Sequence, residues 1–302
     1  MIDVAFFDVD ETLLHLGKPM PGVLDALNAI VQLNSASGHP LLMGVVFNNV
    51  MPSQPVTETE VLAIEAQFRK TVLEPSGLAN FFDPFETKAT ISSRVGISMP
   101  NRGVFENALV RLHSSAALDE CLFITAEASH LSECKGYGMI PIRFGSDVPG
   151  IRCFSNWCDA PLLLANVVAP DNMQNVAIAI APALASHHGL KAFASTNIHG
   201  KLIHGRAKQL FQLNDPRLGA LDGIYVERSA EVTVEITSQG SLGNVQTAEP
   251  GPDEISDAVN FVHTLIQGGR IAHQGESRGT THAVQLDASG REVLIRQRYA
   301  AC

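Results

Sequence analysis

Long hydrophobic runs and an excess of basic residues are both missing from this sequence of 302 residues. The most apolar run, residues 176–185, covers about half the length that a membrane-spanning helix needs, and it contains a proline. The 21 Lys and Arg residues are outnumbered by 31 Asp and Glu, and the net charge of -10 excludes a typical electrostatic binder of nucleic acid. The first residues, MIDVAFFDVD, carry acids where a signal peptide carries basic residues. We therefore expect a cytoplasmic protein that binds neither nucleic acid nor membrane.

Paired cysteines are also lacking. The five cysteines are odd in number and scattered, and Cys153 and Cys158 have no second pair at the spacing of a zinc site. We expect reduced, mostly buried thiols at these positions. With 45% hydrophobic residues the chain can bury a core, and its length is sufficient for two domains.

The first half of the chain alternates short apolar segments with amphipathic ones, which is typical of α/β proteins. Apolar residues recur with the helical period of 3.6, and Thr57 and Glu60 form a capping-box pattern at the start of one helical segment. Short apolar strands separated by helices predict a mainly parallel sheet covered on both faces. The predicted strands are residues 4–8, 41–46, 121–125 and 140–144, and the predicted helices are 21–33, 57–72, 101–113 and 129–137.

After residue 150 the pattern changes to longer alternating segments. Residues 192–197 and 201–213 flank the sequence IHG, residues 225–238 are rich in β-branched side chains, and two last strands surround residues 287–290. Helices are predicted at 173–187 and 252–267. Hairpins combined with two helices predict a smaller α+β domain with an antiparallel sheet. We place the α/β domain at residues 1–160 and the α+β domain, which resembles no known family, at 161–302.

Two aspartates follow the first apolar run. Because side chains alternate along a strand, Asp8 and Asp10 project to the same side of its carboxyl end, where open α/β sheets bind ligands. Two carboxylates there could hold Mg²⁺, with one acting as nucleophile and the other as acid/base. The D-x-D spacing is common, so two solvated acids in a turn are the alternative interpretation.

The longer string VAFFDVDETLLH resembles the first motif of the haloacid dehalogenase (HAD) superfamily, an apolar strand followed by D-x-D-x-T. The resemblance continues over residues 1 to about 165, through LLMGVVFNN, GISMPNRGVFENAL and LFITAEASHLSECKGYGMIPIRFG. It implies a Rossmann-like core and a Mg²⁺-dependent reaction of the phosphatase type. By this similarity Asp8 is the nucleophile, Asp10 is the acid/base and binds the metal through its carbonyl, and Thr12 stabilises the turn.

The second and third motifs depart from the pattern of that family. Phe47 stands where the second motif usually has Ser or Thr, and a slip by one residue would offer Asn48 instead. Met99 replaces the lysine of the third motif, so Arg102 becomes the first candidate to neutralise a phosphate. Two other basic candidates have less positional support: Lys88 and Arg94.

The fourth motif departs further. Thr125 and Ala126 stand in place of its Gly-Asp pair, and His130 stands in place of its later Asp. Glu127 is the nearby carboxylate, either as a replacement metal ligand or as a solvated loop acid. The resemblance therefore implies a weakened Mg²⁺ site, and its ligands would be Asp8, Asp10 and Glu127.

These substitutions lead to three hypotheses. The leading one is a HAD-like protein with impaired catalysis that acts by binding a protein partner or a small phosphorylated ligand. The alternative is an active Mg²⁺-dependent phosphomonoesterase with Asp8 as nucleophile, supported by Asp10, Thr12, Arg102 and Glu127. A second alternative is assembly through the C-terminal sheet, which would make the chain a homo-oligomer.

Overall fold

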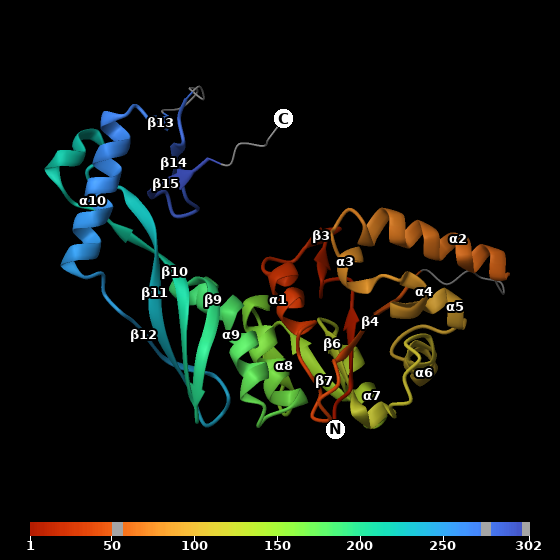
Figure 1. Ribbon diagram of the computed structural model, residues 1–302. Helices are drawn as coiled ribbons and strands as arrows, with labels where there is room; N and C mark the ends of the chain where they lie inside the picture. The colour runs from red at the N-terminus through yellow and green to blue at the C-terminus, as the bar shows by residue number, and fades with distance from the viewer. Residues whose placement is uncertain (50–56, 273–278, 298–302) are drawn as a thin grey trace. The chain divides into compact units, whose positions relative to one another are not determined.

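The computed structural model describes residues 1–49, 57–272 and 279–297, and the chain divides into two compact units (Figure 1). The first unit comprises Met1–Ser186 and Thr237–Leu242, and the second comprises His187–Ile236 and the chain from Gly243 onward. The predicted division between residues 160 and 161 lies earlier than this one. Helix α8 (Ala160–Val168) packs against α1 (Val23–Ile30) and belongs to the first unit, as does most of α9 (Met173–His188).

The first unit is built on a six-stranded sheet, and the prediction of a mainly parallel sheet is confirmed. Its strands lie in the order β5-β4-β1-β6-β7-β8, and every neighbouring pair is parallel. Counted along the chain within this sheet, the order is 3-2-1-4-5-6, which is that of the doubly wound Rossmann fold. The order reverses between β1 and β6, and ligands bind at such a point in open α/β sheets. The strands are β1 (Val4–Asp8), β4 (Leu42–Phe47), β5 (Ala89–Ile91), β6 (Cys121–Thr125), β7 (Ile140–Phe144) and β8 (Arg152–Phe154).

Helices connect these strands. The helix predicted at 57–72 is α2 (Glu58–Phe68), which continues into a π-helical turn at Arg69–Leu73. Its predicted capping box is confirmed, because Thr57 Oγ1 accepts from the Glu60 amide at 3.3 Å and Glu60 Oε2 accepts from the Thr57 amide at 2.7 Å. A small hairpin of β2 (Leu14–His15) and β3 (Lys18–Pro19) follows β1. The remaining helices of the unit are α3 (Ala79–Phe82), α4 (Phe85–Lys88), α5 (Ser92–Val95), α6 (Arg102–Arg111) and α7 (Ala128–Gly136).

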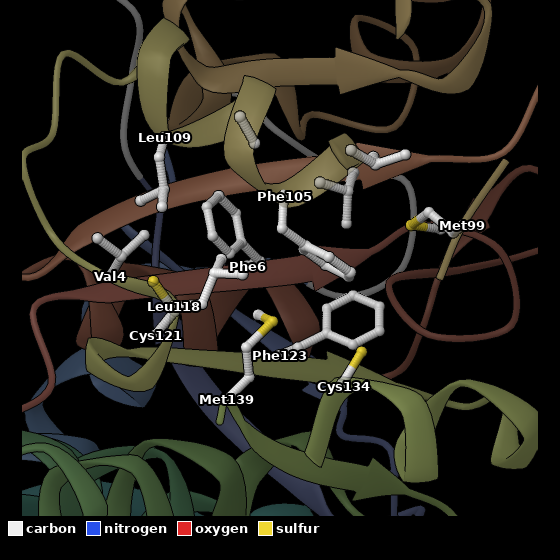
Figure 2. Close-up of a cluster of buried hydrophobic side chains, with 13 residues drawn as sticks. Val4, Phe6, Met99, Phe105, Leu109, Leu118, Cys121, Phe123, Cys134 and Met139 are labelled. Atoms are coloured by element: carbon white, nitrogen blue, oxygen red, sulfur yellow. The ribbon is translucent and has the colours of Figure 1, made fainter. Parts of the chain in front are cut away.

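Aromatic side chains hold β1 on both of its faces. On one face the Phe6 ring lies 5.9 Å from Phe105 of α6, and Phe105 lies 5.1 Å from Phe123 of β6 (Figure 2). On the other face Phe7 packs against Phe82 and Trp157, at 5.9 and 6.4 Å between ring centroids. Full burial of one such side chain contributes about 1.5–3 kcal/mol. The strand is therefore firmly fixed, and the aspartate at its carboxyl end is fixed with it.

The second unit is built on a separate seven-stranded sheet, which confirms the predicted α+β domain. Its order is β13-β14-β15-β11-β10-β9, and β12 also pairs with β11. The predicted hairpins are present as β9–β10 and β14–β15, whereas β13–β14 and β11–β15 are parallel pairs. Helix α10 (Pro252–Gln267) buries Val259, Val262 and Leu265 in the core of this unit. The strands are β9 (Lys191–His199), β10 (Leu202–Gln212), β11 (Tyr225–Ile236), β12 (Leu242–Thr247), β13 (Ile271–Ala272), β14 (His282–Leu286) and β15 (Glu292–Arg296).

The part of the chain that the structure describes contains four cysteines, and all four are free. Cys121 and Cys134 are buried, whereas Cys302 lies outside the described residues. None of its helices is long and apolar enough to cross a membrane.

Candidate functional site

Asp8 is the last residue of β1, and its side chain is buried. Only 6% of the residue is exposed. Its Oδ1 accepts a hydrogen bond from the Val9 amide at 2.9 Å, and its Oδ2 accepts one from the hydroxyl of Thr125 at 2.8 Å. Thr125 ends the neighbouring strand β6, so the parallel pairing of β1 and β6 brings these two side chains together.

Burial governs the ionisation of Asp8. Removing the carboxylate from water raises the pKa of Asp8 to about 7, and the hydrogen bonds from Thr125 and Val9 oppose that rise. The charges of Asp10 and Glu127 add smaller increases. Near neutral pH Asp8 therefore lies between its neutral and ionised forms, whereas an ordinary aspartate is fully ionised.

Replacing Thr125 with valine should raise the pKa of Asp8 further. A hydrogen bond to a charged group contributes about 1.5–3 kcal/mol. Without the hydroxyl, the pKa of Asp8 should therefore be higher by roughly one to two pH units. The carboxyl ¹³C chemical shift of Asp8, followed by NMR against pH, measures the change. Thr125→Ser keeps the hydroxyl and serves as the matched control. An Asp8 pKa that is the same in Thr125→Val and in the native chain would contradict the assigned bond.

Thr12 is fully buried beneath the turn that follows β1. Its Oγ1 accepts from the amide of Ala126 at 2.7 Å, and its carbonyl accepts from Trp157 Nε1 at 2.9 Å. One residue thus joins the turn after β1, the loop after β6 and the segment that carries Trp157. Thr12 therefore holds these three segments together, and it does not line the cavity at Asp8.

A cavity of about 450 Å³ lies at the carboxyl ends of β1 and β6. The described residues that line it include no Lys or Arg. Its wall therefore carries an excess of negative charge at neutral pH, which disfavours a phosphate group there. Four lining residues are acidic, Asp8, Asp10, Glu11 and Glu127, and the others are Asn48, Met99, Ala126, Ser129 and His130.

The basic residues proposed to neutralise a phosphate are engaged elsewhere. Arg102 is exposed on α6, and its Nε donates to Glu106 one helical turn away, at 2.7 Å. Lys88 donates to the carbonyl of Phe81 at 3.1 Å. Arg94 pairs with the carboxylate of Glu65 through two bonds of 2.6 and 2.8 Å. None of the three lines the cavity at Asp8, so the predicted role of Arg102 has no support in the geometry.

Glu127 lines the cavity, but its carboxylate caps helix α7. Its Oε1 accepts from the amide and the hydroxyl of Ser129, at 3.1 and 2.9 Å. These hydrogen bonds lower the pKa of Glu127, which keeps the group ionised. One carboxylate oxygen of Glu127 is thus engaged in closing the first turn of its own helix.

The end of β4 presents Asn48 to the cavity, and not Phe47. The Phe47 ring stacks on Phe68 with centroids 4.5 Å apart, and Phe47 is not among the described residues that line the cavity. Asn48 Oδ1 accepts from the Met99 amide at 2.7 Å, and Asn48 Nδ2 donates to the Met99 carbonyl at 3.4 Å. The amide group is thereby fixed against Met99. The one-residue slip considered from the sequence is the arrangement that the structure has.

His130 is the lining residue that lies beside Asp8, although the sequence marked it only as a substitution. Its Nδ1 is 3.8 Å from Asp8 Oδ2, beyond hydrogen-bonding distance, and has no hydrogen-bond partner among the described residues. Burial lowers the pKa of His130, and the charges of Glu127 and Glu133 oppose this shift. The ring is therefore neutral at pH 7 and supplies no positive charge to an anion.

The residues around Asp8 do not fit the Mg²⁺ ion that the resemblance implies. Mg²⁺ requires near-octahedral oxygen ligands at about 2.0–2.1 Å. Among the residues that the structure describes, no group of three or more His, Cys, Asp or Glu side chains could hold a metal ion. Oε1 of Glu127 accepts hydrogen bonds at the start of α7, and Oδ2 of Asp8 accepts one from Thr125. Among the described residues, the side chains of Asp8, Asp10 and Glu127 therefore do not form a three-carboxylate metal site.

Comparison with known proteins yields similarities of fold. No family model and no curated protein matches the chain. Among matching solved structures, the putative HAD-hydrolase YfnB from Bacillus subtilis, described as bound to magnesium, is 14% identical with a TM-score of 0.35, over 55% of this chain and 99% of that one. A HAD-superfamily hydrolase from Ehrlichia chaffeensis is 13% identical with a TM-score of 0.30, over 55% of this chain and 96% of that one.

A third match is an uncharacterized protein from Corynebacterium glutamicum, at 14% identity and a TM-score of 0.31, over 48% of this chain and 87% of that one. Two of the three are thus hydrolases of the superfamily that the first motif of this chain resembles. At these identities and TM-scores the likeness carries no argument about what this chain binds or catalyses.

Proposed function

We propose that this chain is a HAD-like protein with impaired catalysis, which acts by binding a protein partner or a small ligand. One observation carries the proposal: the described lining of the Asp8 cavity contains several carboxylates and no Lys or Arg. A phosphorylated ligand, which the sequence also suggested, is the less favourable occupant because nothing in that lining compensates its charge.

Energetics support binding over turnover. Phosphoryl transfer depends almost entirely on positioning and on the stabilisation of negative charge. Loss of one preorganised stabiliser typically slows a reaction about 10²–10³-fold. Here the expected lysine is replaced by Met99, Arg102 is paired with Glu106, and Asp8 is held partly protonated. Asp8 stands at the position of the nucleophile, but the described lining of the cavity has no cationic side chain to stabilise the negative charge of the transition state.

A phosphatase assay tests the proposal. The purified chain is incubated with Mg²⁺ and a panel of phosphomonoesters, beside Asp8→Asn and beside Glu11→Gln as a control in the same cavity. We expect all three proteins to release phosphate at the background rate, because the charge-stabilising groups are absent from the cavity. Turnover by the native chain and by Glu11→Gln that vanishes in Asp8→Asn would establish the active phosphomonoesterase instead.

Assembly through the second sheet stays a second candidate because of one strand. β9 is the terminal strand of the sheet order, and most of its side chains are exposed. An edge strand presents unpaired backbone groups that can pair with another chain. Light scattering on the full chain would show a dimer if this edge is used for assembly, and a monomer would exclude it.

A further inference from the structure

The polar groups nearest to Asp8 complete one another without a cation. Asp8 Oδ2 accepts from the Thr125 hydroxyl at 2.8 Å, and the oxygen of that hydroxyl accepts from the amide of Glu127 at 2.9 Å. The other oxygen of Asp8 accepts from the Val9 amide. The hydroxyl proton of Thr125 thus points at the carboxylate, so a positive ion at that oxygen would meet a donor and not a further ligand.

The loop between β6 and α7 is closed in the same manner. The amide of Ala126 donates to Thr12 Oγ1 at 2.7 Å, which fixes the loop to the turn after β1. The carboxylate of Glu127 accepts two hydrogen bonds from Ser129. Both of these hydrogen bonds are made to Oε1 of Glu127, so this oxygen is engaged within the protein.

The imidazole of His130 lies next to Asp8 Oδ2 in the wall of the cavity. The side chain is 12% exposed, and its Nδ1 lies 3.8 Å from that oxygen. A hard cation such as Mg²⁺ prefers oxygen ligands, so a neutral ring nitrogen is a poor substitute for a carboxylate at this position.

We propose that the Asp8 cavity takes its ligand without Mg²⁺ or another hard divalent cation, because Thr125 and His130 stand against Asp8 where such an ion would have to bind. This inference rests on the proposed function, since a protein that binds and does not hydrolyse has no need of the metal. At two lining positions the family motif has an aspartate and this chain has none: Ala126 and His130.

Direct titration with Mn²⁺ alone, followed by electron paramagnetic resonance, tests the native chain. Mn²⁺ is the probe because it shares the preference of Mg²⁺ for oxygen ligands and its free form is readily observed. We expect no saturable binding that distinguishes the native chain from Asp8→Asn. Saturable binding to the native chain that Asp8→Asn abolishes, and that Mg²⁺ displaces, would overturn the inference.

A gain of binding tests the structural reason. The double variant Ala126→Asp/His130→Asp adds two carboxylates to the wall of the same cavity and should bind Mn²⁺ at least about tenfold more tightly than the native chain. The matched control Ala126→Asn/His130→Asn has nearly the same shape without the charge and should gain little. A folded double variant with the affinity of the native chain would overturn the assignment to these two positions. If the double variant does not fold, the comparison of the native chain with Asp8→Asn decides alone.

These outcomes separate the inference from the proposed function. Asp8-dependent Mn²⁺ binding without phosphate release would overturn the inference and leave the binding function standing. Asp8-dependent phosphate release that is insensitive to a metal chelator would overturn the proposed function and leave the metal-free site standing.

Discussion

Replacing Asp8 with asparagine is expected to stabilise the fold by about 4 kcal/mol at pH 8 and by very little at pH 4. Burial raises the pKa of Asp8 from 3.8 to about 7, and a tenfold change in proton affinity between the folded and unfolded chain corresponds to about 1.36 kcal/mol. At a pH between the two pKa values, 3.8 and about 7, the folded chain holds a proton on Asp8 that the unfolded chain has released. The free energy of unfolding therefore falls as pH rises from about 4 to about 7, and it levels off above the folded pKa.

Asparagine removes this dependence because it is neutral at every pH and nearly the same in shape. Urea unfolding of the native chain and of Asp8→Asn at pH 4, 5.5, 7 and 8 measures the effect as the difference between the two proteins. The lowered pKa of His130 contributes a slope of the opposite sign, and His130→Gln in both backgrounds removes this contribution from the comparison. An Asp8→Asn variant that is less stable than the native chain at pH 8 would show that the carboxylate is not held against a desolvation penalty.

Such a gain would also bear on function. Groups with strongly perturbed pKa values cluster at functional sites, where stabilising substitutions often cost function. If Asp8 contributes to ligand binding in this cavity, Asp8→Asn should weaken binding while it makes the protein more stable. A parallel ligand titration of the two proteins would relate stability to binding once a ligand is known.

Replacing Glu65 with alanine is expected to destabilise the first unit by about 3–5 kcal/mol. Glu65 is buried on α2, with 4% of the residue exposed. Its carboxylate accepts two hydrogen bonds from Arg94 of α5, at 2.6 and 2.8 Å, and one from Arg111 of α6, at 2.8 Å. Without Glu65 both guanidinium groups lose their shared partner, and burial already lowers the pKa of Arg111.

The matched control is Glu106→Ala, which breaks an exposed ion pair with Arg102 at one-turn spacing. Pairs of this kind contribute about 0.3–0.5 kcal/mol, so this variant should differ little from the native chain. Denaturant unfolding of both variants at pH 7 gives the comparison. Equal losses in Glu65→Ala and Glu106→Ala would show that the buried cluster contributes no more than a surface pair.

Local patterns in the sequence predicted the first sheet well. The apolar run 4–8, the capping box at Thr57 and Glu60 and the run 121–125 all depend on neighbours a few residues apart, and all are present. The short strands β5 and β8 were not predicted. The boundary predicted at residue 160 also placed most of helix α8 in the second domain, whereas α8 belongs to the first unit. Three residues carry too little periodicity to be recognised, and the place of α8 depends on its contact with α1, which is distant in sequence.

The candidate site divides in the same way. The sequence by itself determined that Asp8 and Asp10 would stand at the carboxyl end of a buried strand, because strand alternation and strand polarity are local properties. Tertiary structure alone decided what surrounds them: that Asn48 and not Phe47 faces the cavity, and that the hydroxyl of Thr125 and the ring of His130 lie beside Asp8. A shift of one residue reverses the side on which a strand residue lies, and Thr125 and His130 reach Asp8 only because β1 and β6 pair in the sheet. Those choices depend on three-dimensional neighbours, and they decided that the aspartates of this chain stand in a cavity whose described lining has no cationic residue.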